Sequence, residues 1–238
     1  MKTLGIIGGM GPMATAYLLE LIIRMTDAKT DQEHLSVIVL DNPQVPDRTS
    51  YILDSSKPSP LPVLEHMAHT LQGIGAGVLC APCVTSHYFY EELAGSVTVP
   101  FVHMVKETAR ELRLAGKQKA GILATTGTVQ TGLFQQALEK EGLSWAVPNE
   151  AVQKLVMSLI YDDIKAGKPA DMGKFRRVSD ELFDVGCDCI ILGCTELSLV
   201  KKDTPLGQGY LDALEVLSKR CVETCGAPLK AQYDRLIS

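Results

Sequence analysis

Two cysteines of this chain stand three residues apart, in a pattern that three different chemistries use. The stretch Cys80-Ala81-Pro82-Cys83 lies between an apolar run and an amphipathic one. A dithiol redox couple would cycle both sulfurs, a metal site would use them as two of its ligands, and an acid/base enzyme would need only one. The surroundings of each sulfur decide among the three.

Neither a redox couple nor a metal site fits these surroundings well. Cys80 still belongs to the apolar run AGVLCA, which predicts a small buried side chain rather than the exposed sulfur of a redox couple. A zinc site needs a second close pair, and Cys187 and Cys189 have the wrong spacing. His66 and His69 lie three residues apart in a helical pattern, which indicates a solvated helix face. We therefore expect no metal site.

A cysteine at the start of a helix suits proton transfer. Cys83 follows one apolar run directly and Cys194 follows another, in LGCTEL. The amide donors and dipole of a helix start stabilise a thiolate. Two such residues on opposite faces of a carbon could invert it, one removing a proton and the other delivering one. Thr85, Ser86 and Thr195, with nearby backbone N–H groups, could hold a carboxylate, although N-capping alone also explains them.

The elements that must position these cysteines follow an alternating pattern. Apolar runs predict strands at residues 2–7, 35–40, 76–81, 120–123 and 188–192, and helical patterns fall at residues 13–25, 61–74, 104–114, 133–142, 150–166 and 171–185. This alternation is typical of parallel strands covered by helices on both faces, hence an α/β fold. Ligands of such sheets bind at the carboxyl ends of the strands, where both cysteines are predicted to lie.

The pattern occurs twice. LGIIGGMGPMATAYLLEL and AGILATTGTVQTGLFQQAL each join a strand, a glycine turn and a helix, and a strand followed by a cysteine comes later at similar spacing in both. This predicts two pseudo-symmetric α/β sandwich domains, each with a mainly parallel sheet, and a site in the cleft between them. The predicted domains are residues 1–99 and 100–206, with residues 207–238 packing back on the first. Chance similarity among βα units is the alternative.

The amino-acid composition argues against several classes of binding partner. The net charge is −5 and no basic run occurs, so we expect no nucleic acid or membrane partner. The early apolar run TLGIIGGM is too short and too broken by glycine for a spanning helix. Seven cysteines are an odd number in a chain without a secretion signal, which indicates free thiols and a cytoplasmic protein.

Six segments together resemble one family. GIIGGMGPMAT, PDRTSYIL, PC-x-T-x-HYFYEEL, LATTGTV, IYDDIKAG and LGCTEL are similar, in this order, to the aspartate/glutamate racemase superfamily, closest to its aspartate racemase branch. The resemblance covers residues 5–199. It implies a cofactor-independent two-base racemase of two similar α/β domains, usually a homodimer, acting on a small amino acid or dicarboxylate.

The resemblance also implies site residues. Cys83 and Cys194 match the paired catalytic cysteines, while Arg48 and Lys165 match cations that hold substrate carboxylates. Positions that line the pocket or flank the cysteines match Met10, Thr85, Ser86, Thr125, Thr195 and Glu196. From the residues alone, Arg48 in the proline-rich loop NPQVPDRTS could equally be a surface arginine, and Lys165 could simply complement a helix dipole.

One position departs from the family. Members usually carry Asn after the first cysteine, where this chain has Val84. Losing a hydrogen bond to a charged group costs roughly 1.5–3 kcal/mol, unless the backbone holds the carboxylate and valine reshapes the side-chain pocket. We expect aspartate to be preferred over glutamate, because two cations match a dicarboxylate. The alternatives are another amino acid or small diacid, or a binder without turnover. His87 and Glu196 are either helpers of the cysteines or simple helix caps.

Overall fold

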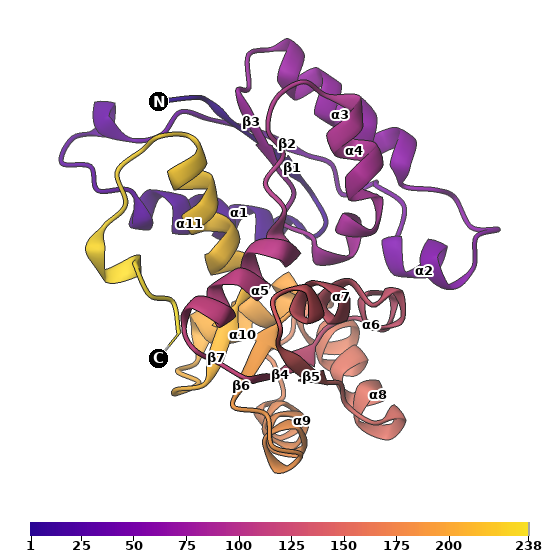
Figure 1. Ribbon diagram of the computed structural model, residues 1–238. Coiled ribbons are helices and arrows are strands. Elements are labelled where there is room, and N and C mark those ends of the chain that lie inside the picture. The colour runs from indigo at the N-terminus through magenta and orange to yellow at the C-terminus, as the bar shows by residue number, and fades with distance from the viewer. Residues whose placement is uncertain (238) are drawn as a thin grey trace.

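The computed structural model describes residues 1–237 and divides them between two lobes, each built on a parallel sheet (Figure 1). The first sheet has the order β2-β1-β3, formed by β1 (Leu4–Gly8), β2 (Val37–Asp41) and β3 (Val78–Cys80). The second has the order β5-β4-β6-β7, formed by β4 (Lys119–Leu123), β5 (Ser144–Ala146), β6 (Cys189–Leu192) and β7 (Tyr210–Asp212). Every strand pair in these two sheets is parallel, which confirms the predicted α/β class.

Helices connect the strands, as parallel pairing requires. The longer helices are α1 (Pro12–Met25), α3 (Leu61–Gly73), α4 (Tyr90–Ser96), α5 (Met104–Leu114), α7 (Leu133–Lys140), α8 (Glu150–Ser158), α9 (Met172–Asp184), α10 (Thr195–Asp203) and α11 (Ala213–Thr224). Shorter ones are α2 (Arg48–Leu53), α6 (Thr126–Thr131), the 3₁₀ turns η1 (Asp31–Glu33), η2 (Val84–Phe89) and η4 (Ala231–Tyr233), and the π-helix η3 (Leu159–Ile164). Among the described residues no helix is long and apolar enough to cross a membrane.

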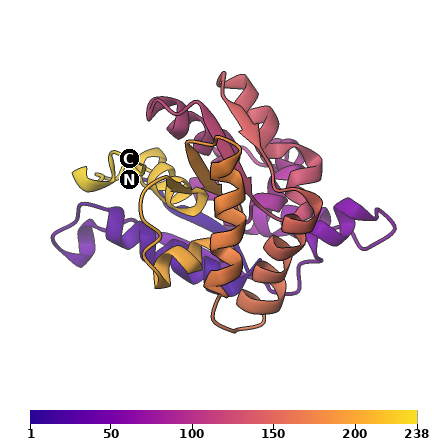
Figure 2. The same ribbon diagram turned by 90° about the horizontal axis from the view of Figure 1, so that it is seen from below.

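Each sheet buries both faces. In the first lobe, side chains of α1 pack on one face and those of α3 and α4 on the other. In the second lobe, α8 and α9 lie side by side over one face (Figure 2) and α7 covers the other. Helices α5 and α11 pack together at the junction of the lobes. This arrangement explains why the strand sequences are apolar without alternation.

One hydrophobic core runs through both lobes. It joins Ile6 and Cys80 of the first sheet to Ile122 and Ile191 of the second, through residues of α5 and α11. These four side chains are fully buried, and burial of a large aliphatic side chain contributes about 1.5–3 kcal/mol. The predicted burial of Cys80 is thereby confirmed, and the two lobes are held together by shared apolar packing.

The lobes repeat one arrangement. In both sheets the first strand of the lobe is central, with the second strand on one side and the third on the other, as β2-β1-β3 and β5-β4-β6. A cysteine follows the third strand in each case: Cys83 after β3 and Cys194 after β6. The pseudo-symmetric order predicted from the repeated motif is therefore present in the strand topology.

The end of the chain contacts both lobes. Residues 207–238, of which 238 lies outside the described residues, were expected to pack back on the first lobe. The strand β7 instead pairs with β6 and extends the second sheet, through Ile190 and Tyr210 among others. Only after β7 does α11 pack against α1. A three-residue strand carries too little apolar pattern to be found in a sequence. The domain boundaries at residues 99 and 206 stay a prediction.

Two helical segments also differ from expectation. The stretch around Arg48 was expected to be a loop because of its prolines, but α2 begins at Arg48, and the Asp47 carboxylate accepts a hydrogen bond from Ser50 N–H at 2.7 Å as its N-cap. The helix predicted at residues 150–166 is α8 followed by the π-helix η3. Single π turns inside helices often mark functional sites.

Candidate active site

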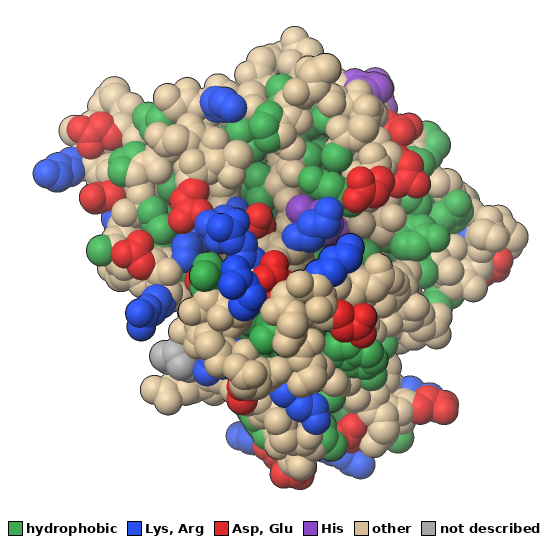
Figure 3. Space-filling model, in the orientation of Figure 1, with side chains coloured by type: hydrophobic (Ala, Val, Ile, Leu, Met, Phe, Trp, Pro, Cys, Tyr) green, Lys and Arg blue, Asp and Glu red, His purple; other side chains and the backbone are tan. Residues whose placement is uncertain are grey.

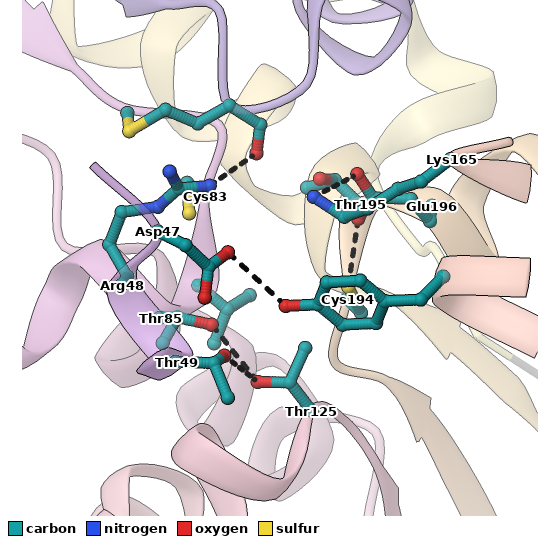
Figure 4. Close-up of a pocket in the computed structure, with 13 residues that line it drawn as sticks. Asp47, Arg48, Thr49, Cys83, Thr85, Thr125, Lys165, Cys194, Thr195 and Glu196 are labelled. Atoms are coloured by element: carbon teal, nitrogen blue, oxygen red, sulfur yellow. Dashed lines mark hydrogen bonds and ion pairs between the residues drawn. The ribbon is translucent and has the colours of Figure 1, made fainter. Parts of the chain in front are cut away.

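Both candidate cysteines line one cavity between the lobes (Figure 4). Cys83 occupies the N-cap position of η2 and Cys194 that of α10, so each lies at a helix start beyond the carboxyl end of a strand. The two side chains reach the cavity from opposite sides. All the other predicted site residues except Ser86 line the same cavity, namely Met10, Arg48, Val84, Thr85, Thr125, Lys165, Thr195 and Glu196.

Ser86 does not belong to the cavity wall. Its side chain is buried, and its hydroxyl donates a hydrogen bond of 2.7 Å to the carbonyl oxygen of Cys83. Substrate contact by Ser86 stays a prediction, but in this geometry its hydroxyl points back along its own helical turn. It caps the backbone instead, which was the alternative interpretation of this residue type.

Three cavity residues were missed from the sequence: Asp47, Thr49 and Tyr161. The Tyr161 hydroxyl donates to Asp47 Oδ2 at 3.3 Å and so connects the π-helix η3 to the N-cap of α2. A signal existed, because Tyr161 precedes Lys165 by four residues, a spacing that places both on one helix face. Asp47 looked like a loop residue beside Arg48.

The surroundings of Cys194 favour its protonated thiol. Its sulfur donates a hydrogen bond to Glu196 Oε2 at 2.9 Å. Burial raises the pKa of Cys194 well above its ordinary value, and the negative charge of Glu196 adds to this, while Lys165 acts in the opposite direction. The charged thiolate of Cys194 is therefore disfavoured in this geometry.

Cys83 has a cation beside it. The Arg48 guanidinium faces the Cys83 sulfur (Figure 4), and the charges of the two groups interact. Arg48 is buried, and its Nη1 donates to the carbonyls of Val45 and Pro46 at 3.2 and 3.1 Å. Its Nε is buried without an acceptor. A guanidinium N–H without an oxygen or nitrogen acceptor can donate to an anion. Because the side chain is buried, Arg48 is not the surface residue that its type allowed.

Lys165 is already paired. Its Nζ lies 3.2 Å from Glu196 Oε1 and 5.3 Å from the centre of the Tyr161 ring. Glu196 therefore bridges the Cys194 thiol on one oxygen and Lys165 on the other. Together with Arg48 and Asp47, the cavity wall carries two cations and two carboxylates.

Comparisons with known proteins assign the chain to a family. The family model described as Asp/Glu/hydantoin racemase matches residues 7–218.

The chain belongs to the Asp/Glu/hydantoin racemase family.

Relatives of this racemase have related activities. The chain is 27% identical to the broad specificity amino-acid racemase RacX of Bacillus subtilis, over 93% of this chain and 97% of the relative. It is 26% identical to glutamate racemase of Shewanella frigidimarina, over 65% of this chain and 61% of the relative. The solved structure of Picrophilus torridus aspartate racemase matches it with a TM-score of 0.82 at 27% identity, over 98% of both chains. The family predicted from the six segments is confirmed.

Threonines close the racemase cavity across the two lobes. Thr85 of the first lobe lies 3.1 Å from Thr125 and 3.0 Å from Thr128 of the second, between side-chain oxygens. The Thr49 hydroxyl donates to Thr125 at 3.3 Å. Thr85 and Thr125, which were predicted to contact substrate, bond to each other in this arrangement and join the lobes.

The space between the cysteines is small. The cavity measures about 10 Å³, close to the space that one water molecule needs. A second cavity of about 430 Å³ adjoins it and shares Arg48, Lys165 and Glu196. An amino acid exceeds the inner space, so its binding requires these side chains or the lobes to move apart.

The stability of the racemase at acid pH should depend in part on His87. Burial lowers the pKa of His87 to about 4, whereas an unfolded chain binds that proton near pH 6.5. Between these pH values His87 binds a proton only in the unfolded state. Its contribution to the free energy of unfolding is therefore fully present above pH 6.5 and is lost as the pH falls toward 4. Between pH 7.5 and pH 5, we expect the free energy of unfolding to fall by about 2 kcal/mol less in His87→Gln than in the wild type.

Urea unfolding at these two pH values measures this difference. His103 lies 5.2 Å from the His87 ring, between ring centres, and burial lowers its pKa to about 3. It remains in the variant, so the difference between the proteins isolates His87. An equal loss in wild type and His87→Gln would show that His87 is not held neutral.

Proposed function

We propose that this protein racemises an amino acid without a cofactor, by a two-base mechanism at Cys83 and Cys194. The observation that supports it is the placement of two cysteines on opposite sides of one buried cavity, each at a helix start. The Cys83 thiolate removes the α-proton, and the electron pair of the C–H bond remains on Cα and its carboxylate. The Cys194 thiol then donates its proton to the opposite face. The reverse reaction exchanges the two roles.

Charge that builds on the carboxylate during proton removal needs donors. The first N–H groups of a helix have no acceptor within the helix, and η2 and α10 begin at Val84 and Thr195, both on the cavity wall. The buried Nε of Arg48 adds a charged donor. Preorganised donors of this kind are typically the largest contribution to stabilising such a transition state.

We propose an acidic amino acid as the substrate, with aspartate preferred and glutamate possible on chemical grounds. Arg48 and Lys165 on the cavity wall support this, as does the similarity to an aspartate racemase. A second carboxylate would have to displace Glu196 from Lys165, because the pair is already formed.

A second candidate is another amino acid or small diacid. Val84 is buried, packs in the shared core and lines the cavity, where the family usually has Asn. An apolar side chain here favours an apolar group of the substrate over a charged one. The similarity to a broad specificity amino-acid racemase points in the same direction.

We also propose an oligomeric state and a cellular location for the protein. The family resemblance supports a homodimer. All seven cysteines are free, which suits a reducing compartment and supports a cytoplasmic location.

The experiment combines two measurements on the wild type. Loss of circular dichroism of L- or D-aspartate reports inversion, and deuterium incorporation at Cα in D₂O reports proton removal. We expect both with aspartate, and a panel of glutamate and neutral and basic amino acids decides between the two candidates. Thermal stabilisation by aspartate without deuterium incorporation would indicate a binder, and absence of both signals with every amino acid would refute the racemase proposal.

A further inference from the structure

His87 lies outside the cavity wall and is bonded through both ring nitrogens. It is 4% exposed. Its Nε2 accepts a hydrogen bond from Met104 N–H at 3.1 Å, and its Nδ1 lies 3.0 Å from the carbonyl oxygen of Cys83. Because Nε2 accepts, the ring is neutral and its proton is on Nδ1, which donates to Cys83. His87 therefore connects the residue before η2 to the first residue of α5.

The carbonyl of Cys83 is fixed by more than one donor. Besides His87, it accepts from Ser86 N–H at 3.1 Å and from the Ser86 hydroxyl at 2.7 Å. The Cys83–Val84 peptide is trans, and in a trans peptide the carbonyl and the N–H point in opposite directions. The carbonyl points to His87, away from the cavity. The N–H of Val84 is thereby turned toward the cavity, beside the Cys83 side chain.

The other end of the connection lies at the junction of the lobes. Met104 begins α5, which packs against α7 and α11. His87 also lines a separate cavity of about 220 Å³, together with His103 and Lys106. Figure 3 shows a histidine side chain beside Lys or Arg side chains on one face of the molecule. The ring is thus reachable from a hollow that is distinct from the one holding the cysteines.

We propose that His87 is a positioning residue for proton transfer: its neutral ring holds the Cys83–Val84 peptide so that the thiolate and the Val84 N–H both face the substrate. The proposal rests on the proposed function of Cys83. His87 is not itself the base, because both nitrogens are engaged by backbone groups and the ring does not line the cysteine cavity. Ser86 supports the same carbonyl from within the turn.

Two substitutions of His87 should each preserve one of its two hydrogen bonds. The amide of Asn places a donor near the position of Nδ1, and the amide of Gln places an acceptor near that of Nε2. His87→Asn should keep the hydrogen bond to Cys83 and retain kcat within about 5-fold of the wild type. His87→Gln keeps only the hydrogen bond to Met104. Its kcat should fall roughly 10- to 100-fold with KM nearly unchanged, as expected when a reacting group is misplaced. Steady-state kinetics in both directions of racemisation measures the split.

Further measurements separate positioning from folding. In His87→Ala, added imidazole can enter through the 220 Å³ cavity and should restore part of kcat. His103→Asn is the matched control, because it removes an imidazole from the same cavity and Asn still caps α5; its kcat should stay at the wild-type value. Equal kcat in the Asn and Gln variants, or absence of rescue by imidazole, would overturn the proposal.

A readout without turnover keeps this test independent of the proposed function. The rate of alkylation of Cys83 by iodoacetamide, located by mass spectrometry, should rise in His87→Gln and stay near wild type in His87→Asn. If the wild type shows no racemisation, the function fails while the alkylation pattern still tests the positioning. If the wild type racemises and both variants are alkylated alike, only the positioning fails.

Discussion

Cys194→Ser should abolish racemisation while one enantiomer of the substrate still exchanges its α-proton with solvent. The remaining cysteine, Cys83, can remove a proton from one face and return deuterium to that same face, but nothing delivers a proton to the other. Cys83→Ser should show the mirror behaviour, with exchange confined to the opposite enantiomer. Loss of one general acid/base group typically lowers the rate about 10²- to 10⁴-fold. Deuterium incorporation into separate L- and D-substrate samples measures both effects.

Cys80→Ala is the matched control for the two serine variants. Cys80 is fully buried in β3, three residues before Cys83, and does not line the cavity. Its variant should racemise at the wild-type rate, whereas a redox couple would make Cys80 as necessary as Cys83. Full racemisation by either serine variant would remove that cysteine from the mechanism.

Arg48→Met should lower kcat/KM by roughly 10- to 100-fold, the value of a charged hydrogen bond to a carboxylate. The guanidinium faces Cys83 and its Nε is buried without an oxygen or nitrogen acceptor, so the substitution removes both the cation beside Cys83 and the proposed donor to substrate. Arg48→Lys should recover only part of the loss, because a lysine lacks the planar fork that also bonds Val45 and Pro46.

Thermal unfolding of the same variants keeps this result separate from misfolding. The Arg48 side chain donates to backbone carbonyls, so Arg48→Met will also lower stability. Arg24→Met removes an exposed arginine that pairs with Glu20 and should change neither rate nor stability measurably. Wild-type kcat/KM in a folded Arg48→Met protein would show that Arg48 does not bind the substrate.

The cysteine pair could be predicted because its determinants are local. A strand, a turn and a helix follow each other within a few residues, and the carboxyl ends of parallel strands lie at one edge of a sheet. The repeated motif then predicted two lobes facing each other. The outcome agrees for Cys83 and Cys194, which reach one cavity from opposite sides.

The remaining site residues depended on geometry that a linear pattern does not contain. Thr85 and Ser86 are neighbours of similar type, but a 3₁₀ turn has three residues per turn, so their side chains diverge by about 120°; one faces the cavity and the other its own backbone. Tyr161 and Asp47 meet only because the lobes dock. The strand β7 was missed because three residues carry no period.

Each turnover should leave the two cysteines in exchanged protonation states. Under the two-base proposal, each turnover ends with the proton moved from one sulfur to the other, so the resting protein is set to convert the enantiomer it has just made. Restoring the first state requires proton exchange with bulk water. A cavity of about 10 Å³ holds about one water molecule, so this exchange is fastest when the cavity opens to release the product. The protonation state of the two cysteines therefore records the direction of the last reaction only until the product has left and the thiols have exchanged protons with water.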